Sequence, residues 1–305
     1  MSQSKTYLVT GCAGFIASQV ARMLLGQGER VVGIDNMNDY YDVSLKQHRL
    51  EQLSQDDFEF RQIDLEDRAA IGQLFQDHQF DGVLNLAARA GVRYSMVNPH
   101  VYMTTNAMGS LNLLEEMRQH GVKKYVLAST SSLYAGQEMP FDETLPVNTP
   151  ISSYAASKKA AELMAYSHHF LYDIDISICR YFTVYGPAGR PDMCIFRFIK
   201  WIDEGTPLEL FGDGTQSRDF TYVDDIVEGV SRLIPHAAAP DSGFDPDHPN
   251  PGSSWAPYRL YNIGNRQKER LMDMVSILER ELGQEAVKEY LPMQPGDVKA
   301  TWADG

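Results

Sequence analysis

A glycine-rich turn near the N-terminus constrains the fold of this chain more than any other feature. It joins a predicted buried strand, residues 6–10, to a predicted helix that runs to about residue 27. Gly11 allows the tight turn, and Gly14 lets the backbone come close to a pyrophosphate, which the N–H groups at the start of the helix would hold. A strand, a glycine turn and a helix in this order predict a dinucleotide-binding α/β unit.

An acidic residue after the second predicted strand indicates which dinucleotide fits. The strand covers residues 30–34, and Asp35 follows it, 24 residues after Gly11. A carboxylate at this place accepts hydrogen bonds from the adenosine ribose and repels a 2′-phosphate, so the sequence predicts NAD rather than NADP. The third small position is Ala17 instead of glycine, and we expect alanine still to permit close helix–strand packing.

Strands and helices continue to alternate along the chain. Predicted strands lie at residues 58–63, 83–86, 125–128 and 174–178, and predicted helices at 68–77, 101–119 and 154–172. This alternation implies an α/β fold, a doubly wound parallel Rossmann sheet with its ligands at the C-terminal ends of the strands. At those ends, Asp64 could meet the adenine amino group, and the small residues Ala87 and Ala88 would let the backbone lie along the cofactor.

The composition changes after about residue 180, where glycine and proline cluster, so we predict two lobes. The NAD-binding Rossmann domain is expected to comprise residues 1–180, with later returns near 218–235 and 258–265. A smaller α/β substrate lobe is expected to comprise residues 181–217 and 266–305. The segment from 236 to 257 is rich in Pro, Gly, Ser and Asp, which is typical of a surface loop.

Charge and cysteine content restrict the partners and the compartment. The net charge is −14 without a basic run, which argues against nucleic acid, and an anionic substrate would have to be bound by local arginines. No apolar run approaches the length of a membrane span, and no signal peptide is recognisable at the start. The three cysteines, Cys12, Cys179 and Cys194, lack metal-ligand spacing, and their odd number predicts a reducing cytoplasm.

A tyrosine and a lysine near the start of the helix at 154–172 are candidates for acid–base chemistry. Tyr154 and Lys158 are four residues apart, so both side chains would lie on one helical face. A tyrosine has an ordinary pKa of ~10, and an ammonium group one turn away would lower that pKa. By itself, the pair is more typical of an amphipathic helix with a packed tyrosine and a surface lysine.

A run of hydroxyl side chains, Ser129 to Ser132, follows the fifth predicted strand. In isolation, such a run is typical of a turn with capping roles. Beside the Tyr154 helix at the same sheet edge, a hydroxyl group such as that of Thr130 can relay a proton or hold a substrate hydroxyl. The sequence therefore predicts Thr130, Tyr154 and Lys158 as catalytic residues and predicts no metal site.

With these motifs in view, the whole chain resembles the extended short-chain dehydrogenase/reductases of the nucleotide-sugar epimerase group. The matching motifs include Thr10-Gly11-x-x-Gly14-Phe15-Ile16, Asn85-Leu86-Ala87-Ala88, Tyr154-x-x-x-Lys158, Arg180-Tyr181-Phe182 and Arg218-Asp219-Phe220. Within that group, the segments at 35–42, 90–95, 189–193 and 254–258 resemble those of the UDP-glucuronate 4-epimerases. Two departures are Ala135 in place of a usual glycine and an end at Gly305, where relatives continue for a short stretch.

The resemblance implies an NAD-dependent isomerase that interconverts UDP-glucuronate and UDP-galacturonate through a 4-keto sugar, as a homodimer. Tyr154 would take the C4 hydroxyl proton while hydride passes to NAD, and both would return on the opposite face. The implied cofactor residues are Gly11, Gly14, Phe15, Ile16, Asp35, Asn36, Asp64, Leu65, Leu86, Ala87, Ala88, Asn106, Tyr154 and Lys158. The implied substrate residues are Arg93, Ser131, Ser132, Thr183, Arg190, Arg218 and Asp297.

The substrate residues have different implied tasks and alternatives. Arg218 would pair with the diphosphate, although an ion pair with a nearby Asp is the alternative, and Asp297 is a candidate for the uridine. Arg190 and Arg93 are candidates for the sugar carboxylate, with Thr183 as a hydrogen-bond donor. Arg190 could instead be solvated in its loop, and Arg93 could equally serve a phosphate of NAD.

Three other activities compete with this interpretation. Related decarboxylases and dehydratases carry acidic residues where this chain has Ser131 and Ser132, so no second acid/base is available at C5. A UDP-glucose 4-epimerase is the nearest alternative and would not need Arg190 near the sugar. A noncatalytic NAD sensor on the same fold is disfavoured because Thr130, Tyr154 and Lys158 are all retained.

Overall fold

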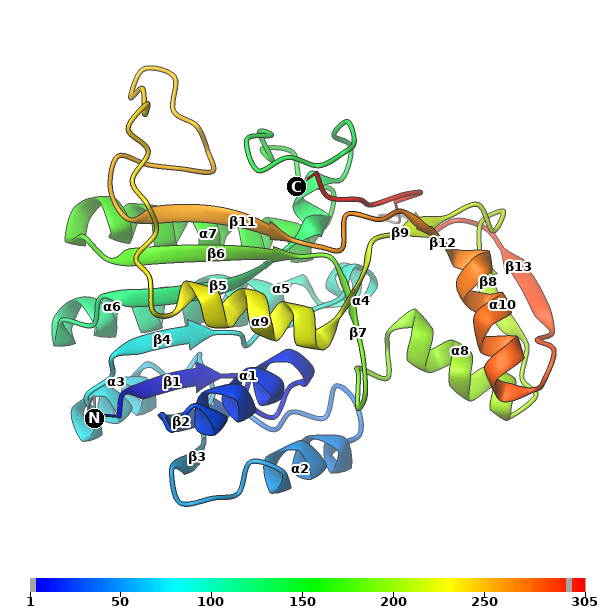
Figure 1. Cartoon of the computed structure of the whole chain (residues 1–305), viewed down its shortest axis with the longest axis horizontal. Helices are drawn as coiled ribbons and strands as arrows, with labels where there is room; N and C mark the ends of the chain where they lie inside the picture. The colour runs from blue at the N-terminus through cyan, green and yellow to red at the C-terminus, as the bar shows by residue number, and fades with distance from the viewer. Residues whose placement is uncertain (1–3, 295–297, 305) are drawn as a thin grey trace.

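The computed structural model describes residues 4–294 and 298–304. Its centre is a seven-stranded sheet in the order β11-β6-β5-β4-β1-β2-β3, in which every neighbouring pair is parallel (Figure 1). The strands span Thr6–Thr10 (β1), Arg30–Asp35 (β2), Phe58–Gln62 (β3), Gly82–Asn85 (β4), Lys124–Thr130 (β5), Asp175–Tyr181 (β6) and Tyr258–Ile263 (β11). The predicted α/β Rossmann fold is confirmed.

Helices cover both faces of the sheet, and the alternation along β1 shows how the layers are held. The helices span Phe15–Gly26 (α1), Val43–Glu51 (α2), Arg68–Asp77 (α3), Val92–Val97 (α4), Gly109–His120 (α6), Ser153–Tyr172 (α7) and Val223–Leu233 (α9). Leu8 packs in a core with α3, α6 and α7, whereas Val9 packs on the other face with α1 and α9. Successive strand residues point to opposite faces, so one apolar strand contributes to two cores.

The helix predicted over 101–119 is divided in the structure. It consists of α5 (Pro99–Tyr102), a π-helical turn η1 (Met103–Met108) and α6. Gly109 follows the π turn and packs closely on Leu65, in the loop between β3 and α3. A Cβ added at Gly109 would lie 2.7 Å from the Leu65 Cβ. A π turn accommodates one extra residue, which shifts the helical face. Hydrophobic periodicity cannot reveal it, because the apolar positions on either side remain helical.

A smaller lobe lies beyond the C-terminal ends of the sheet strands, toward which the strand arrows point (Figure 1). Its core contains Phe198, Ile202, Leu208, Leu210 and Val275. Its elements are α8 (Cys194–Asp203), β8 (Leu208–Phe211), β9 (Ser217–Arg218), β12 (Glu269–Arg270), α10 (Leu271–Leu282) and β13 (Lys288–Leu291), and β7 (Thr183–Tyr185) and β10 (Phe220–Tyr222) connect it to the large domain. Between the lobes, β10 pairs with β7, and α9 then packs on α1 in the large domain.

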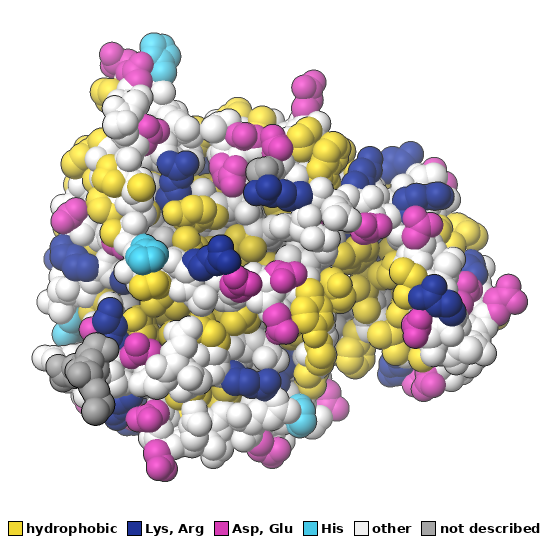
Figure 2. Space-filling model, in the orientation of Figure 1, with side chains coloured by type: hydrophobic (Ala, Val, Ile, Leu, Met, Phe, Trp, Pro, Cys, Tyr) yellow, Lys and Arg dark blue, Asp and Glu magenta, His cyan; other side chains and the backbone are white. Residues whose placement is uncertain are grey.

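The surface carries mixed charge. On the face shown in Figure 2, acidic and basic side chains are interspersed, and hydrophobic side chains gather where the two lobes meet. Within residues 4–294 and 298–304, no helix is long and apolar enough to span a membrane. The same part of the chain contains no group of three or more His, Cys, Asp or Glu side chains arranged to hold a metal ion.

Candidate active site

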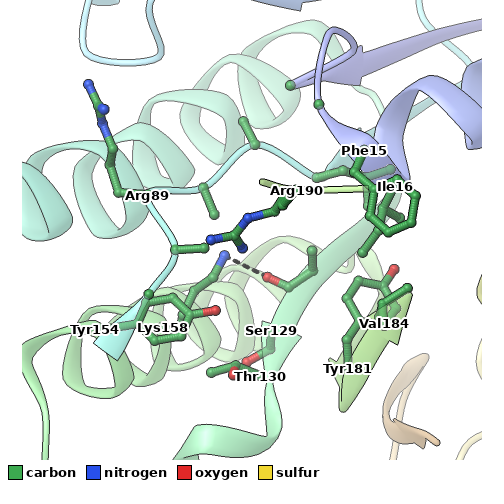
Figure 3. Close-up of a pocket in the computed structure, with 18 of the residues that line it drawn as sticks. Phe15, Ile16, Arg89, Ser129, Thr130, Tyr154, Lys158, Tyr181, Val184 and Arg190 are labelled. Atoms are coloured by element: carbon green, nitrogen blue, oxygen red, sulfur yellow. Dashed lines mark hydrogen bonds between the residues drawn. The ribbon is translucent and has the colours of Figure 1, made fainter. Parts of the chain in front are cut away.

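A cavity of about 430 Å³ lies at the C-terminal edge of the sheet, under the smaller lobe. Its wall includes most of the predicted site residues: Gly11, Gly14, Phe15, Ile16, Asp35, Asn36, Asp64, Leu65, Leu86, Ala87, Ala88, Thr130, Ser131, Ser132, Tyr154, Lys158, Thr183, Arg190 and Arg218. These residues come from separate chain segments. The parallel sheet brings most of them to one edge, and the segments outside the sheet add Thr183, Arg190 and Arg218. Figure 3 shows several of them around the cavity.

The glycine turn has the geometry of a dinucleotide cradle. Gly11 has φ +69°, and an added Cβ there would lie 2.8 Å from the Ala87 Cα. The Gly14 N–H donates to the Gly11 carbonyl at 2.7 Å, and Gly14 caps α1 without a side-chain hydrogen bond. The first N–H groups of α1 are therefore left to an anion, and the backbone is open enough for a pyrophosphate to approach.

The adenosine end of the cavity contains a polar cluster around Asp35. The Asp35 carboxylate accepts from the Met37 N–H at 2.8 Å, and the Lys46 ammonium lies 3.3 Å from the same oxygen. Asn36 donates to the Asp64 carboxylate at 2.7 Å. Lys46 is buried and was not among the predicted residues, because α2, which carries it, has only weak amphipathic periodicity. Asp35 is thus held in place for a ribose, with a cation beside it.

The predicted effect of Lys158 on the pKa of Tyr154 stays a prediction. The buried Lys158 ammonium donates to the Ala128 carbonyl at 2.7 Å (Figure 3). Burial lowers the pKa of Lys158 to about 8 and raises the pKa of Tyr154 above its ordinary value. Two groups oppose the rise at Tyr154: a hydrogen bond with Thr130, and the positive charge of Arg190. A cation from the segment between β7 and α8 therefore favours the phenolate, and sequence spacing could not identify it.

Arg190 reaches over the catalytic pair from the segment between β7 and α8. Its guanidinium makes a bidentate ion pair with Asp192, with Nε–Oδ1 at 3.0 Å and Nη2–Oδ2 at 2.5 Å. Asp192 also forms a hydrogen bond with the hydroxyl group of Tyr40, from the loop after β2. In Figure 3 the Arg190 guanidinium lies above Lys158, whereas Arg89 points away from this group. Arg190 is thus half-buried in the cavity wall rather than free in solvent.

A buried ion pair lies behind the catalytic residues. Glu162, one turn after Lys158 on α7, accepts from Arg180 Nε at 2.9 Å and Arg180 Nη2 at 2.8 Å. The Ser129 hydroxyl group also donates to Glu162, at 2.6 Å. The Arg180 guanidinium lies 4.8 Å from the ring centroid of Tyr134. This network connects α7, β5 and β6, and it fixes the strand end that carries Thr130.

Among the described residues, two predicted site residues, Asn106 and Arg93, do not lie in the cavity wall. Asn106 is behind it, where its side chain forms hydrogen bonds with both the N–H and the carbonyl of Arg89, because the π turn directs it there. The Arg93 guanidinium lies 4.1 Å from the ring centroid of Phe211, so it contacts the second lobe by a cation–π interaction. Asp297 lies outside the described residues.

Comparisons with known proteins identify the family of this chain. The profile of the "NAD dependent epimerase/dehydratase family" matches residues 7–264. The chain belongs to this family. A UDP-glucuronate 4-epimerase of Thermodesulfobacterium geofontis is 51% identical over 98% of this chain and 87% of its own length. A probable UDP-glucuronate 4-epimerase of Rhizobium meliloti is 43% identical, over 97% of this chain and 88% of its own length.

Solved structures of family members are also similar. The UDP-glucuronic acid 4-epimerase from Bacillus cereus, in complex with UDP-glucuronic acid and NAD, has a TM-score of 0.86 at 36% identity, covering 98% of this chain and 90% of that one. A UDP-glucose 4-epimerase from Thermotoga maritima, with UDP-glucose, has a TM-score of 0.82 at 28% identity, covering 98% and 89%. The family resemblance predicted from the sequence is confirmed.

Several residues in the cavity wall of this chain were not predicted from the sequence. Among them are Asn38, Tyr40, Tyr41, Lys46 and Arg89. Four of the five come from the loop after β2 and from α2, in a region where no periodic pattern stands out. The segment Asp35–Asp42 did carry a signal, since it matched the UDP-glucuronate 4-epimerases, but a resemblance without a known contact assigns no role.

Proposed function

We propose that this protein is an NAD-dependent epimerase that interconverts UDP-glucuronate and UDP-galacturonate at C4. The observation that carries the proposal is the meeting of Tyr154, Thr130 and the Arg190 guanidinium in one cavity whose opposite end is a dinucleotide cradle. It is supported by relatives up to 51% identical that are named UDP-glucuronate 4-epimerases. The phenol and hydroxyl provide proton transfer, and the guanidinium provides a partner for a sugar carboxylate.

The proposed chemistry is a reversible oxidation at C4. When bound, NAD supplies a hydride acceptor that is restored within each turnover. Tyr154, as the phenolate, takes the proton of the C4 hydroxyl as C4 becomes a ketone, and Thr130 holds that oxygen through its own hydroxyl group. After the 4-keto sugar presents its opposite face, Tyr154 returns the proton to the new C4 oxygen. The same phenol therefore acts as base and then as acid.

The proposed carboxylate site must also prevent a side reaction. A 4-keto glucuronate is a β-keto acid and loses carbon dioxide readily. Arg190, with hydroxyl groups of Ser131, Ser132 and Thr183, lines the cavity where it could hold the carboxylate away from the alignment that the loss requires. Serines at 131 and 132 provide no carboxylate for proton transfer at C5. We expect Arg190→Ala to reduce turnover of UDP-glucuronate more than that of UDP-glucose; equal losses would remove this assignment.

We also propose that residues 181–217 and 266–305 hold the UDP moiety over the NAD-binding domain of residues 1–180, 218–235 and 258–265. Arg218, at the edge of the cavity, donates to the Ser217 and Lys299 carbonyls and would turn toward the diphosphate. The contact of Arg93 with Phe211 favours a role in connecting the two lobes over direct binding of the sugar carboxylate. The assignment of Asp297 to the uridine stays a prediction.

The test is product analysis with the purified protein. UDP-glucuronate and UDP-glucose are incubated separately with the NAD-loaded protein, and the products are resolved by NMR. Formation of UDP-galacturonate supports the proposal. UDP-xylose or a UDP-4-keto-pentose would indicate a decarboxylase, and conversion of UDP-glucose alone would indicate a UDP-glucose 4-epimerase. NAD binding without turnover of either sugar would indicate a sensor.

We infer further that the protein is a homodimer formed through α6 and α7. One side of α7 exposes Leu163, Met164, Phe170 and Leu171, which are spaced as a single helical face. Exposed apolar side chains in such a stripe are typical of an interface. A cytoplasmic location stays a prediction of the cysteine content.

A further inference from the structure

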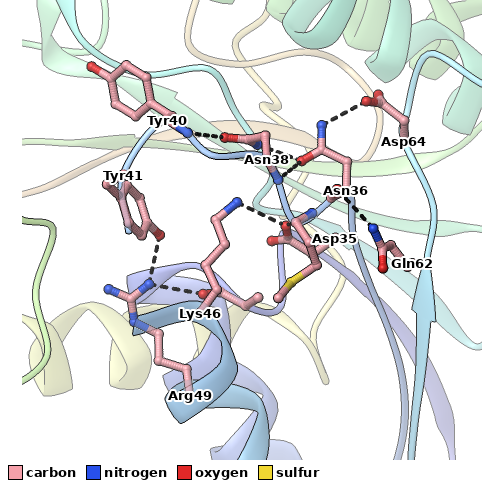
Figure 4. A network of polar contacts seen from close by, with 11 residues as sticks. Asp35, Asn36, Asn38, Tyr40, Tyr41, Lys46, Arg49, Gln62 and Asp64 are labelled. Carbon is pink, nitrogen blue, oxygen red and sulfur yellow. Dashed lines mark hydrogen bonds and ion pairs between the residues drawn. The ribbon is translucent and has the colours of Figure 1, made fainter. Parts of the chain in front are cut away.

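A buried arginine on α2 joins three segments of the cavity wall. Arg49 lies near the C-terminal end of α2 and is 2% exposed. Its Nη1 donates to the Ala13 carbonyl at 3.0 Å, within the glycine turn, and to the Tyr41 hydroxyl group at 2.7 Å. Figure 4 shows the guanidinium below Tyr41, next to the cluster around Asp35. One side of the guanidinium is thus committed to the proposed cofactor site.

The other side of the same guanidinium reaches a segment far away in sequence. Arg49 Nη2 donates to the Ala188 carbonyl at 2.8 Å and to the Gly189 carbonyl at 3.4 Å, and Nε donates to the Ala188 carbonyl at 3.3 Å. All these acceptors, with Ala13 and Tyr41, lie outside α2. Arg49 is therefore placed to connect segments rather than to stabilise its own helix.

The acceptors of Arg49 are all uncharged. Within residues 4–294 and 298–304, no carboxylate forms an ion pair with it. A buried guanidinium without an opposite charge is costly unless its donors are satisfied by well-placed acceptors. The planar fork satisfies them on two edges at once, which a lysine ammonium cannot do. The buried guanidinium is therefore stable only while the segments that carry its acceptors, Ala13, Tyr41 and Ala188, stay packed around it.

The distant segment carries Arg190. Ala188 has φ +52°, a left-handed conformation that is unfavourable for a residue with a Cβ. Contacts must hold it there, and its carbonyl receives two of the Arg49 hydrogen bonds. An added Cβ at Gly189 would approach the Phe15 ring to 3.9 Å, so the segment lies directly against the start of α1. The backbone that leads into Arg190 is thus fixed to the glycine turn through Arg49.

We propose that Arg49 is a positioning residue that fixes the Ala188–Arg190 segment to the glycine turn. We call this set of hydrogen bonds the latch. The latch slows release of NAD, because the Arg190 segment and the glycine turn line the same cavity and must separate for a dinucleotide to leave. It also holds Arg190 in the position from which its charge acts on Tyr154 and on the sugar carboxylate. This second effect rests on the proposed function, whereas the first does not.

The first measurement concerns the cofactor alone. NAD-loaded protein is mixed with excess labelled NAD, without any sugar, and the exchange rate is followed. We expect Arg49→Met to exchange about tenfold faster or more, because it loses hydrogen bonds from a charged donor on both sides of the cavity. The matched control is Arg22→Met on α1, whose exposed guanidinium donates to the Gln52 side chain next to α2. We expect its exchange rate to stay within about twofold of the wild type.

A second variant covers the case in which Arg49→Met fails to fold. Arg49→Lys keeps the buried charge but cannot reach both edges, so exchange should again be faster while the far-UV circular dichroism matches the wild type. Exchange within about twofold of the wild type in both folded variants would overturn the latch. Faster NAD exchange in the variants, together with a wild-type protein that turns over no UDP sugar, would keep the latch and overturn the proposed function.

The second measurement separates positioning from general damage. With UDP-glucuronate, Arg49→Lys should raise KM by a larger factor than it lowers kcat, because a displaced Arg190 weakens substrate binding before chemistry. A loss confined to kcat, with KM unchanged, would contradict the effect on Arg190.

Discussion

A phenol, a hydroxyl group and a guanidinium from three distant segments meet around one proposed reacting carbon. Burial raises the pKa of Tyr154, and the Arg190 charge and the Thr130 hydrogen bond oppose that rise. Burial also makes each of these interactions stronger than it would be in water. At the residue scale, the chemistry therefore depends on how firmly Arg190 and Thr130 are held against the phenol.

Removing the phenol oxygen tests its role directly. We expect Tyr154→Phe to lower kcat by about a hundredfold to ten-thousandfold, since it removes the proposed general acid and base. NAD binding and thermal stability should change little, because the oxygen's contact is with Thr130. Steady-state rates and NAD titration provide the measurement. Near-normal turnover would exclude Tyr154 as the acid and base.

Arg190 should influence the pH dependence as well as substrate binding. Its positive charge lowers the pKa of Tyr154, so Arg190→Ala should raise that pKa further. If the phenolate is the active form, activity rises with pH through this pKa, and the rising limb of the kcat profile should move to higher pH. Arg190→Lys keeps the charge and should leave the limb near its original position. Identical profiles for wild type and Arg190→Ala would contradict this coupling.

The helix α7 is the element that organises the site. Ser152 caps its N-terminus by accepting from the Ala155 N–H at 3.1 Å, so the helix begins just before Tyr154. Tyr154, Lys158 and Glu162 then follow at intervals of four residues on one face. That face continues from the cavity into the buried ion pair with Arg180. The catalytic end of α7 is thus anchored to two strands of the sheet.

Breaking the anchor should cost much more than breaking a surface pair. We expect Glu162→Gln to lower the free energy of unfolding by about 3–5 kcal/mol, because the buried Arg180 charge loses its counter-charge. The matched control is Glu209→Gln, which removes the exposed partner of Arg197 and should cost about 1 kcal/mol or less. Urea unfolding measures both. Equal costs would show that the pair does not anchor the helix.

At the scale of the whole molecule, the net charge of −14 opposes both NAD and the proposed UDP sugar, which are anions. Binding must therefore come from local devices: the N-terminus of α1, Arg190 and Arg218 at the cavity, all of which lie where the two lobes meet. The sheet supplies one side of that junction and the smaller lobe the other. Both must be present for the cavity to exist.

The exposed face of α7 makes a prediction about assembly. If it forms the dimer interface, Leu163→Asp combined with Leu171→Asp should give a monomer, because two charges would have to be buried. Light scattering coupled to gel filtration should show twice the mass of one chain for the wild type. Val287→Asp, at an exposed apolar residue of the smaller lobe, is the control and should remain dimeric. A wild-type monomer would contradict the proposed dimer.

Local patterns in the sequence determined the fold and the part of the site that lies at the edge of the sheet. The glycine turn, Asp35 and the alternation of strands and helices predicted the Rossmann sheet, because parallel strands must end at one edge. That rule also placed the hydroxyl run beside Tyr154. These predictions succeeded because each depends on a short segment, or on a topology that a few segments fix.

Only the tertiary structure decided which side chains meet across the lobes. Asn106 lies behind the cavity wall because of the π turn, and Arg93 contacts Phe211 in the smaller lobe. Lys158 donates to a backbone carbonyl, and the charge of Arg190 acts on Tyr154. The tertiary structure also showed Arg49 reaching Ala188, 139 residues away. Such contacts depend on loop conformation and on the burial of charge, and neither leaves a periodic trace in a single sequence.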